Sequence, residues 1–361
     1  MREGERVKKE LWKGNEAIAE AAIRAGCDCF FGYPITPQNE IPEYMALHMP
    51  KHGKVFVQSE SEVAAINMVY GAAASGKRAM TSSSSPGISL KQEGISYMVG
   101  AELPGVIVNV MRGGPGLGSI QPGQSDYFQA TRGGGNGDYH MVVLAPANLQ
   151  EAVDVMFEAF HSSDQYRNPV LVLADGLIGQ MMEPIVWKEH TPRVLPDKTW
   201  AADGRRGERE HNNFITSLLL AADACEARNI RLKAKFDEME QNECRWEEIG
   251  TEDADLILVS YGTPSRIAQS AAEQLRAQGL KVGLLRPITV WPFPTARIRE
   301  LAAGKCRGFL AVEMSQGQMV DDVRLAVGEK KPVGFYGRCG GVVPTVSEVR
   351  LAAEKFYQEV Q

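Results

Sequence analysis

Short apolar runs alternate with longer segments of helical periodicity through the first half of the chain. Six runs of strand length are CDCFFGY (27–33), VFVQS (55–59), RAMTSS (78–83), GVIVNVM (105–111), MVVLAP (141–146) and PVLVLAD (169–175). Helical patterns cover residues 15–25, 39–49, 62–76, 90–102 and 149–162. One strand followed by one helix, repeated, predicts an α/β fold with a parallel sheet covered by helices on both faces.

The alternation stops after Pro184 and resumes near residue 254. Residues 188–253 are polar and charged, with one helical tract near 212–243, and we expect them to connect two domains. The later strand patterns are LILVSYG (256–262), KVGLLRP (281–287), GFLAVEM (308–314) and VGFYG (333–337). We therefore expect a first α/β domain over residues 1–187, a connector over 188–253 and a smaller second α/β domain over 254–361.

Length and charge narrow the classes of protein. With 361 residues, the chain is long enough for two domains, each with its own core. Its 39 basic and 45 acidic residues are spread along the sequence and give a formal net charge of −6, which argues against nucleic acid or an anionic membrane surface as a partner. The charged N-terminus lacks the apolar core of a signal peptide, and no run has the length of a membrane span. We expect a soluble, cytoplasmic protein.

The six cysteines are scattered, with no C-x-x-C pair and no histidine cluster beside them. Free thiols and no metal site on this chain are therefore expected. Cys27 and Cys29 alternate along a predicted strand and share one face of it, which favours core packing over metal ligation.

The first candidate for chemistry is Glu62, which opens an apolar helix rich in small residues, EVAAINMVYGAAASG. Small residues let a backbone or a flat ring approach closely. The preceding strand ends at Gln58, and ligands of open α/β sheets sit at the carboxyl ends of the strands. A carboxylate at a helix start can equally be a favourable partner of the helix dipole, worth about 0.3–1 kcal/mol. Glu60, two residues earlier, is the rival acid.

Three other features accompany this helix. Arg112 ends an apolar strand, where its guanidinium could grip a carboxylate or form an ordinary salt bridge. Thr36 lies between two prolines, a pattern that also suits a simple turn. The run TSSSSPG (81–87) reads as a serine-rich turn that could cradle phosphate or line a pocket. The glycine-rich GGPGLG (113–118) contains a proline and opens no helix, so we expect a mobile loop and not a dinucleotide site.

Several blocks of the sequence resemble the α subunits of 2-oxoacid:ferredoxin oxidoreductases, and the resemblance covers nearly the whole chain. The blocks are GYPITPQNEIPEYM, QSESEVAAINMVYGAAASG, SSSSPGISLKQEGISY and VNVMRGGPGLG, with LLRPITVWPFP, AVEMSQGQMVDDVR and YGRCGGVVPT nearer the C-terminus. This similarity implies a parallel-sheet thiamine-diphosphate-binding domain of the pyrimidine type, followed by a transketolase C-terminal-like α/β domain. Among subfamilies, these sequence blocks most resemble those of the 2-oxoisovalerate (3-methyl-2-oxobutanoate) enzymes.

The resemblance also implies roles for individual residues. Glu62, in register with Ala65 and Gly71, would meet a ring nitrogen of the cofactor's aminopyrimidine and promote the tautomer that activates the thiazolium carbon. Arg112 and Thr36 would help to orient the substrate carboxylate. The remaining residues expected to line the cofactor pocket are Pro34, Ile35, Ser84, Ser85 and Pro86.

Several parts of such an enzyme are missing from the sequence. The GDG motif that holds the diphosphate through magnesium is absent, since Gly137-Asp138 lacks its continuation, and no cysteine cluster suits an iron–sulfur centre. The resemblance therefore implies a β subunit carrying the GDG diphosphate and Mg²⁺ site, a γ subunit, a small ferredoxin-like iron–sulfur subunit and ferredoxin as partners. This chain alone should be inactive.

The implied reaction is oxidative decarboxylation of a branched-chain 2-oxoacid, with coenzyme A as acyl acceptor and ferredoxin as electron acceptor. Two alternatives stay open at this point. The same chemistry could act on 2-oxoglutarate or pyruvate, because one methylene contributes only about 1–3 kcal/mol to discrimination. The chain could also be a non-catalytic scaffold that keeps the fold and only assembles its partners.

Overall fold

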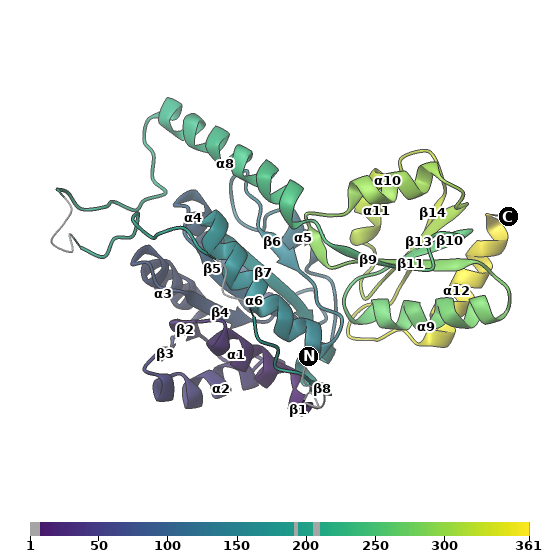
Figure 1. Ribbon diagram of the computed structural model, residues 1–361, viewed down its shortest axis with the longest axis horizontal. Coiled ribbons are helices and arrows are strands. Elements are labelled where there is room, and N and C mark those ends of the chain that lie inside the picture. Colours follow the sequence, from purple (N-terminus) through teal and green to yellow (C-terminus); the bar gives the residue numbers. More distant parts are fainter. Residues whose placement is uncertain (1–7, 191–193, 205–209, 361) are drawn as a thin grey trace, which may run out of the picture.

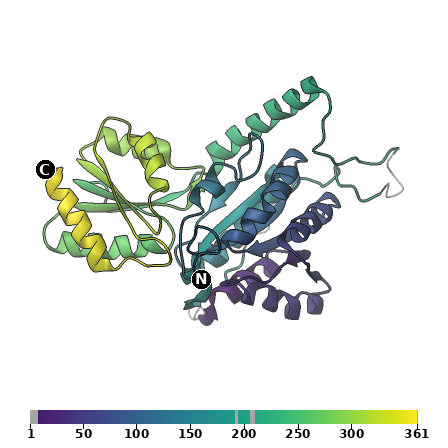
Figure 2. The same ribbon diagram turned by 180° about the vertical axis from the view of Figure 1, so that it is seen from behind.

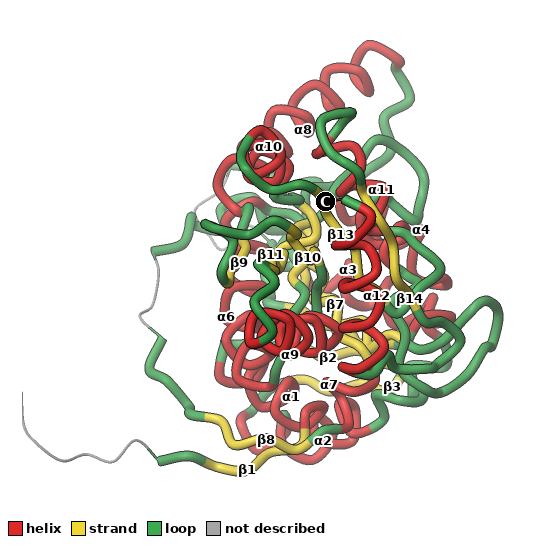
Figure 3. Tube along the Cα trace, turned by 90° about the vertical axis from the view of Figure 1, so that its right-hand side faces the viewer, coloured by secondary structure: helices red, strands yellow, loops and turns green. Residues whose placement is uncertain are grey.

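A computed structural model describes residues 8–190, 194–204 and 210–360. The chain forms a seven-stranded sheet in its first half and a five-stranded sheet in its second half (Figure 1). A two-stranded pair, β1 (Glu10–Lys13) with β8 (Met182–Ile185), lies at the margin of the first half beside α2 (Glu40–His48), as Figure 3 shows. The expected α/β class is thus observed.

The first sheet has the strand order β12-β6-β7-β5-β4-β2-β3. Its bounds are β2 Cys29–Gly32, β3 Val55–Gln58, β4 Ala79–Ser83, β5 Gly105–Met111, β6 Val142–Leu144, β7 Pro169–Asp175 and β12 Thr289–Trp291. All neighbours pair in parallel except β12, which is antiparallel to β6. The central strands β5 and β7 are buried along their whole length, as expected for a parallel sheet covered on both faces. All six predicted strands are confirmed.

Helices cover both faces of this sheet. On one face α1 (Gly14–Arg24) packs against α6 (Leu149–Tyr166), and on the other α3 (Glu62–Ala74) packs against α4 (Ser85–Gly100) (Figures 1 and 2). Two shorter helices, α5 (Tyr127–Thr131) and α7 (Gly176–Gln180), follow β5 and β7. The α3 and α4 pair lies beside the carboxyl ends of the strands, where the candidate residues gather.

Helix α4 begins at Ser85, five residues before the predicted start, and β4 runs to Ser83, so the reading of TSSSSPG as a turn is wrong except at Ser84. Pro86 occupies the first turn of the helix, where its missing N–H is not needed. Because of this early start, Gly87 and Lys91 belong to one face of the same helix, one turn apart.

The second sheet has the order β14-β13-β10-β11-β9. Its bounds are β9 Trp246–Ile249, β10 Leu256–Val259, β11 Val282–Pro287, β13 Gly308–Glu313 and β14 Val333–Gly337. It is parallel except for the edge strand β9. Helices α9 (Thr263–Ala277) and α12 (Val346–Glu359) cover one face, and α10 (Thr295–Ala303) and α11 (Met319–Val327) the other (Figure 1).

Two strands cross the expected division of the chain. Strand β9 lies within the predicted connector but completes the second sheet, and β12 lies within the predicted second domain but extends the first sheet. The predicted helical tract near 212–243 is α8 (Ala222–Glu243), which starts ten residues later and runs along the outside of the first half (Figure 1). Strand β12 of the second half thus joins the sheet of the first half, so the two halves are linked by more than the connector.

Cys27 and Cys29 are buried in the main hydrophobic core as free thiols, which confirms core packing. Among the residues that the structure describes, no group of three or more His, Cys, Asp and Glu side chains is placed to hold a metal ion. No helix in the described part of the chain is both long enough and apolar enough to cross a bilayer.

Candidate functional site

The candidate residues meet at one edge of the first sheet. Parallel pairing of β2 with β3 and β4, and of β4 with β5, aligns the carboxyl ends of these four strands. The segments that follow carry Thr36 after β2, Glu62 after β3, Ser84 to Pro86 after β4 and Arg112 after β5. Ser59 ties two of these segments together, since its Oγ donates to the carbonyl of Gly32 at 3.1 Å.

Burial separates Glu62 from its rival. Glu62 is the first residue of α3 and is only 6% exposed, whereas Glu60 is exposed in the preceding loop. The helix is capped by Ser61, whose Oγ accepts a hydrogen bond from the Ala64 backbone N–H at 3.2 Å. Of the two acids, Glu62 is the one held inside the molecule by a defined helix start.

Gly87, in the first turns of α4, makes room for the Glu62 carboxylate. A Cβ placed on Gly87 would lie 2.5 Å from Glu62 Oε1 and 2.0 Å from Ser83 Oγ. Only glycine fits there without displacing both side chains. Nearly two turns farther along, a Cβ on Gly94 would lie 2.5 Å from Ile66, so the two helices approach closely from Gly87 to Gly94.

Lys91 is a residue that we did not single out from the sequence. Its side chain is fully buried, and its Nζ has no hydrogen-bond partner in the structure. Burial lowers the pKa of Lys91 to about 8, while the negative charge of Glu62 acts in the opposite direction. A signal was available in the sequence, because Lys91 interrupts an apolar stripe formed by Ile88, Ile95 and Met98 on a predicted helix.

Arg112 links two loops of the site. Its Nη1 donates to the carbonyl of Thr36 at 3.0 Å, and its Nη2 donates to the carbonyl of Leu117 at 2.9 Å. The side chain is 7% exposed, and its Nε has no partner. The guanidinium therefore forms no salt bridge to a described acidic residue, and several of its five N–H groups remain available.

A second missed residue, Asp126, organises the backbone around Arg112. Its Oδ2 accepts hydrogen bonds from Ser85 Oγ at 2.6 Å and from Asn109 Nδ2 at 2.9 Å. Ser85 Oγ in turn accepts from the Arg112 N–H at 3.1 Å. Burial raises the pKa of Asp126, against the effect of these donors and of the Arg112 charge. Nothing in the sequence marks one aspartate in a long loop as buried.

The other predicted pocket residues are distributed unevenly. Thr36 and Ile35 are half-buried and Pro34 is exposed, all in the loop after β2. Ser84 is fully buried, and its Oγ has no hydrogen-bond partner. Pro86 is half-buried at the start of α4. The loop residues thus lie at the surface of the site, while the serines lie at its base.

The glycine-rich loop borders a cavity between the two halves of the chain. The cavity has a volume of about 670 Å³ and is lined by residues of five segments, including Ser85, Gly114, Asp126, Ser315 and Gly340. Residues 113–118 open no helix, as expected. Gln124 fixes the two halves here, because its Nε2 donates to the carbonyl of Tyr261 at 2.9 Å and its Oε1 accepts from the Met314 N–H at 2.9 Å.

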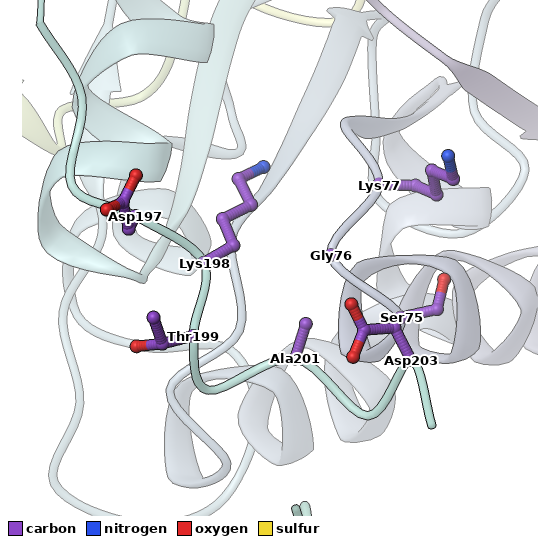
Figure 4. A pocket seen from close by; sticks show the side chains of 8 residues that line it. All are labelled: Ser75, Gly76, Lys77, Asp197, Lys198, Thr199, Ala201 and Asp203. Carbon is purple, nitrogen blue, oxygen red and sulfur yellow. The ribbon is translucent and has the colours of Figure 1, made fainter. Parts of the chain in front are cut away.

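Another hollow, of about 380 Å³, lies at the opposite end of α3 (Figure 4). It is formed where the end of α3, at Ser75 to Lys77, meets the segment that contains Asp197 to Ala201. Lys198 forms an ion pair with Asp164 at 2.8 Å. Because α3 has 13 residues, about 18 Å of helix separates this hollow from Glu62, so it is not part of the candidate site.

Comparison with protein-family models identifies the class of protein. Residues 20–231 match the thiamine-diphosphate-binding region of the pyruvate flavodoxin/ferredoxin oxidoreductases, and residues 254–349 match core domain II of pyruvate:ferredoxin oxidoreductases. The chain therefore belongs to the 2-oxoacid:ferredoxin oxidoreductase family, as the sequence resemblance predicted.

Curated relatives align along almost the whole chain. It is 53% identical to the ketoisovalerate oxidoreductase subunit VorB of Methanothermobacter thermautotrophicus, over 96% of each chain. Identity to the 2-oxoglutarate synthase subunit KorA of the same organism is 37%, over 93% of this chain and 96% of that one. Both relatives are named as subunits, which is consistent with a multi-subunit enzyme.

Solved structures confirm the two-part fold. A 2-oxoglutarate:ferredoxin oxidoreductase from Magnetococcus marinus, with 2-oxoglutarate, coenzyme A and succinyl-CoA bound, superposes with a TM-score of 0.87 at 27% identity. The match covers 98% of this chain and 65% of that longer chain. A split-gene transketolase, described as an inactive β4 tetramer, superposes at 0.61 with 15% identity, over 97% and 99% of the two chains, and supports the fold alone.

The residues at the sheet edge fit the aminopyrimidine of thiamine diphosphate. This ring is flat and carries both hydrogen-bond donors and acceptors, and the site offers a buried carboxylate, Glu62, packed against Gly87. The hydroxyls of Ser83 and Ser84 are buried without partners, as expected of groups that await a ligand.

Proposed function

We propose that this chain supplies the aminopyrimidine half of the thiamine diphosphate site in a 2-oxoisovalerate:ferredoxin oxidoreductase. The complete enzyme would decarboxylate the 2-oxoacid oxidatively, pass the acyl group to coenzyme A and reduce ferredoxin. The observation that carries this proposal is the buried Glu62 carboxylate opposite Gly87, within a region that matches the cofactor-binding family model.

Glu62 would hold a proton toward a ring nitrogen of the cofactor. When bound, thiamine diphosphate supplies the nucleophile that attacks the keto carbon and the electron sink that permits loss of carbon dioxide. The task of this chain is to orient the ring and to keep water away from the Glu62 proton. Burial of Glu62 between the first turns of α3 and α4 supports this role.

Arg112 and Thr36 would bind the carboxylate of the 2-oxoacid. The guanidinium is already oriented by the carbonyls of Thr36 and Leu117, and its free Nε–H and remaining Nη–H groups are suited to a carboxylate. The Asp126 carboxylate holds the backbone on which Arg112 is placed, through Ser85.

Partner subunits would complete the enzyme. A β subunit would hold the diphosphate through Mg²⁺, and a γ subunit with a small iron–sulfur subunit would conduct electrons to ferredoxin. The subunit names of the relatives support such an assembly. Identity of 53% to the ketoisovalerate subunit, against 37% to the 2-oxoglutarate subunit, favours a branched-chain substrate.

The test uses the complex purified by co-expression with the β subunit and its partners. Dye reduction with a viologen is measured with 2-oxoisovalerate, 2-oxoisocaproate, pyruvate and 2-oxoglutarate. The branched-chain acids are expected to give the highest kcat/KM, and a preference for 2-oxoglutarate or pyruvate would reassign the substrate.

The matched pair of variants for the catalytic role is Glu62→Gln and Glu60→Gln. Glu62→Gln is expected to lower kcat by about 100-fold or more, the usual contribution of a positioned acid. The exposed neighbour, Glu60→Gln, is expected to stay within about twofold of the wild type. Near-normal turnover in Glu62→Gln would instead indicate a scaffold subunit whose cofactor meets another acid.

A further inference from the structure

The position of Lys91 on α4 places it on the side of the helix that faces Glu62. Lys91 follows Gly87 by one turn on α4, and long side chains in helices lean toward the helix N-terminus, in this case toward Gly87 and the Glu62 carboxylate. The contact between Gly94 and Ile66 closes the space between α3 and α4 on the other side. Lys91 thus lies on the face of α4 that packs against α3, between the positions that face Glu62 and Ile66.

Glu62 is the charged group that acts on Lys91. Besides Glu62, the ionisable groups near the site are Tyr70 on α3, Arg112 after β5, Asp126 beside Ser85 and Asp175 at the end of β7. Of these charges, Glu62 is the one that raises the pKa of Lys91 against the effect of burial. The ammonium is fully buried and forms no hydrogen bond. An ammonium in such a place is unfavourable unless it is compensated, so a purely structural residue here would more readily be methionine or leucine.

The proposed function requires a proton on Glu62 in a site that is closed to water once the cofactor and the partner subunit are in place. A neighbouring acid can supply such a proton within the closed site, without uptake from the buffer. Lys91 lies on α4 between Gly87, which faces Glu62, and Gly94, which faces Ile66, and no ion pair within 4 Å joins it to Glu62. Its lowered pKa makes it a readier proton donor than an ordinary lysine.

We propose that Lys91 is a positioning residue that acts through Glu62 as its internal proton source, a role that rests on the proposed function of Glu62. The flexible Lys91 side chain first turns to bring its ammonium into hydrogen-bond contact with Glu62. An N–H bond of the ammonium then breaks and an O–H bond forms on the Glu62 carboxylate. Lysine is left as a neutral amine and glutamate as a neutral carboxyl, and release of the cofactor reverses the transfer. The proton count and the charge of the pair are conserved.

The test counts protons and does not rely on turnover. The assembled complex is freed of cofactor and titrated with thiamine diphosphate and Mg²⁺ by calorimetry, in two buffers of different ionisation enthalpy. At pH 7 the Lys91→Met complex is expected to take up about one more proton per site than the wild type, because the wild type draws that proton from Lys91. At pH 9, where Lys91 is mostly neutral, the two complexes should take up nearly equal numbers.

Two further variants test whether Lys91 acts by donating a proton or only through its positive charge. Lys91→Arg keeps the charge but does not release a proton, so it should show the same extra uptake as Lys91→Met. Lys235→Met is the matched control, because burial also lowers the pKa of Lys235 to about 8, but its ammonium lies on α8, 3.6 Å from Glu102 and outside the site. Its proton count should equal that of the wild type.

Equal proton uptake at pH 7 in the wild type and Lys91→Met would overturn the proposal, as would a wild-type count in Lys91→Arg. If Lys91→Met fails to assemble, Lys91→Gln carries the same measurement, since it retains a polar side chain of similar reach. A loss of activity in Glu62→Gln with unchanged proton counts in the Lys91 variants would refute this role alone. Normal activity in Glu62→Gln would refute the proposed function itself.

Discussion

Gly87→Ala tests whether the Glu62 carboxylate has to lie where the structure places it. The new Cβ would lie 2.5 Å from Glu62 Oε1 and 2.0 Å from Ser83 Oγ, well inside ordinary van der Waals contact. The carboxylate must retreat by about 1 Å, and a displacement of that size in a catalytic group typically lowers the rate about 100-fold. Overpacking should destabilise the fold by only about 1–3 kcal/mol, offset in part by the better helix propensity of alanine.

The assay is viologen reduction by the assembled complex, with thermal unfolding measured in parallel. Gly71→Ala is the matched control, because it lies on α3 and a Cβ there meets no atom of this chain within 4 Å. Its activity should be retained, and its stability should rise by up to about 1 kcal/mol. Full activity of Gly87→Ala would contradict this prediction, because it would show that catalysis does not depend on the position of the Glu62 carboxylate.

Two further predictions concern charged residues of the site. Arg112→Lys replaces a guanidinium that reaches the carbonyls of both Thr36 and Leu117 with a single ammonium. The KM for the 2-oxoacid, measured by steady-state kinetics, should rise about tenfold, which corresponds to about 1.4 kcal/mol. A KM within twofold of the wild type would contradict the role of Arg112. Lys91→Met should change the pH dependence of stability. The pKa of Lys91 falls from 10.5 to about 8 on folding, so between these values the unfolded chain binds more protons, and wild-type stability should rise by up to about 3 kcal/mol relative to the variant from pH 8 to pH 10.5. Thermal unfolding midpoints of both complexes across this range measure the change, and parallel curves would contradict it.

The sheets were predictable from the sequence because their strands are continuous apolar runs between polar breaks. Strands β5 and β7 are buried along their full length, and their sequences are accordingly nearly continuous apolar runs. Strand β12 has three residues and is followed by a proline, so its pattern carries little information. Its pairing with β6 depends on tertiary contacts, which a local sequence pattern does not reveal.

The site was predictable only in part, for a different reason. Glu62 and Arg112 stand at the ends of regular elements, where their positions follow from the elements themselves. Lys91 and Asp126 owe their importance to burial and to neighbours distant in sequence, such as Glu62 for the first and Ser85 for the second. The mistaken start of α4 hid the first pairing, because a turn at residues 81–87 would not place Gly87 and Lys91 on one helical face.

Two helix N-termini meet at the Glu62 carboxylate, and Lys91 lies on the same face of α4 as the Gly87 that contacts it. Glu62 is the first residue of α3, and it lies against Gly87 in the first turns of α4, so both helix dipoles favour a negative charge there. Each dipole favours the carboxylate by about 0.3–1 kcal/mol, which offsets part of the cost of burying it without a salt bridge. The dipoles cannot release a proton, however, whereas an ammonium can. If Lys91 served only to neutralise Glu62, it would duplicate what the helix ends already provide at the expense of burying a second charge. Its presence on the face of α4 that packs against α3 is therefore better explained by the proton that it carries than by its charge.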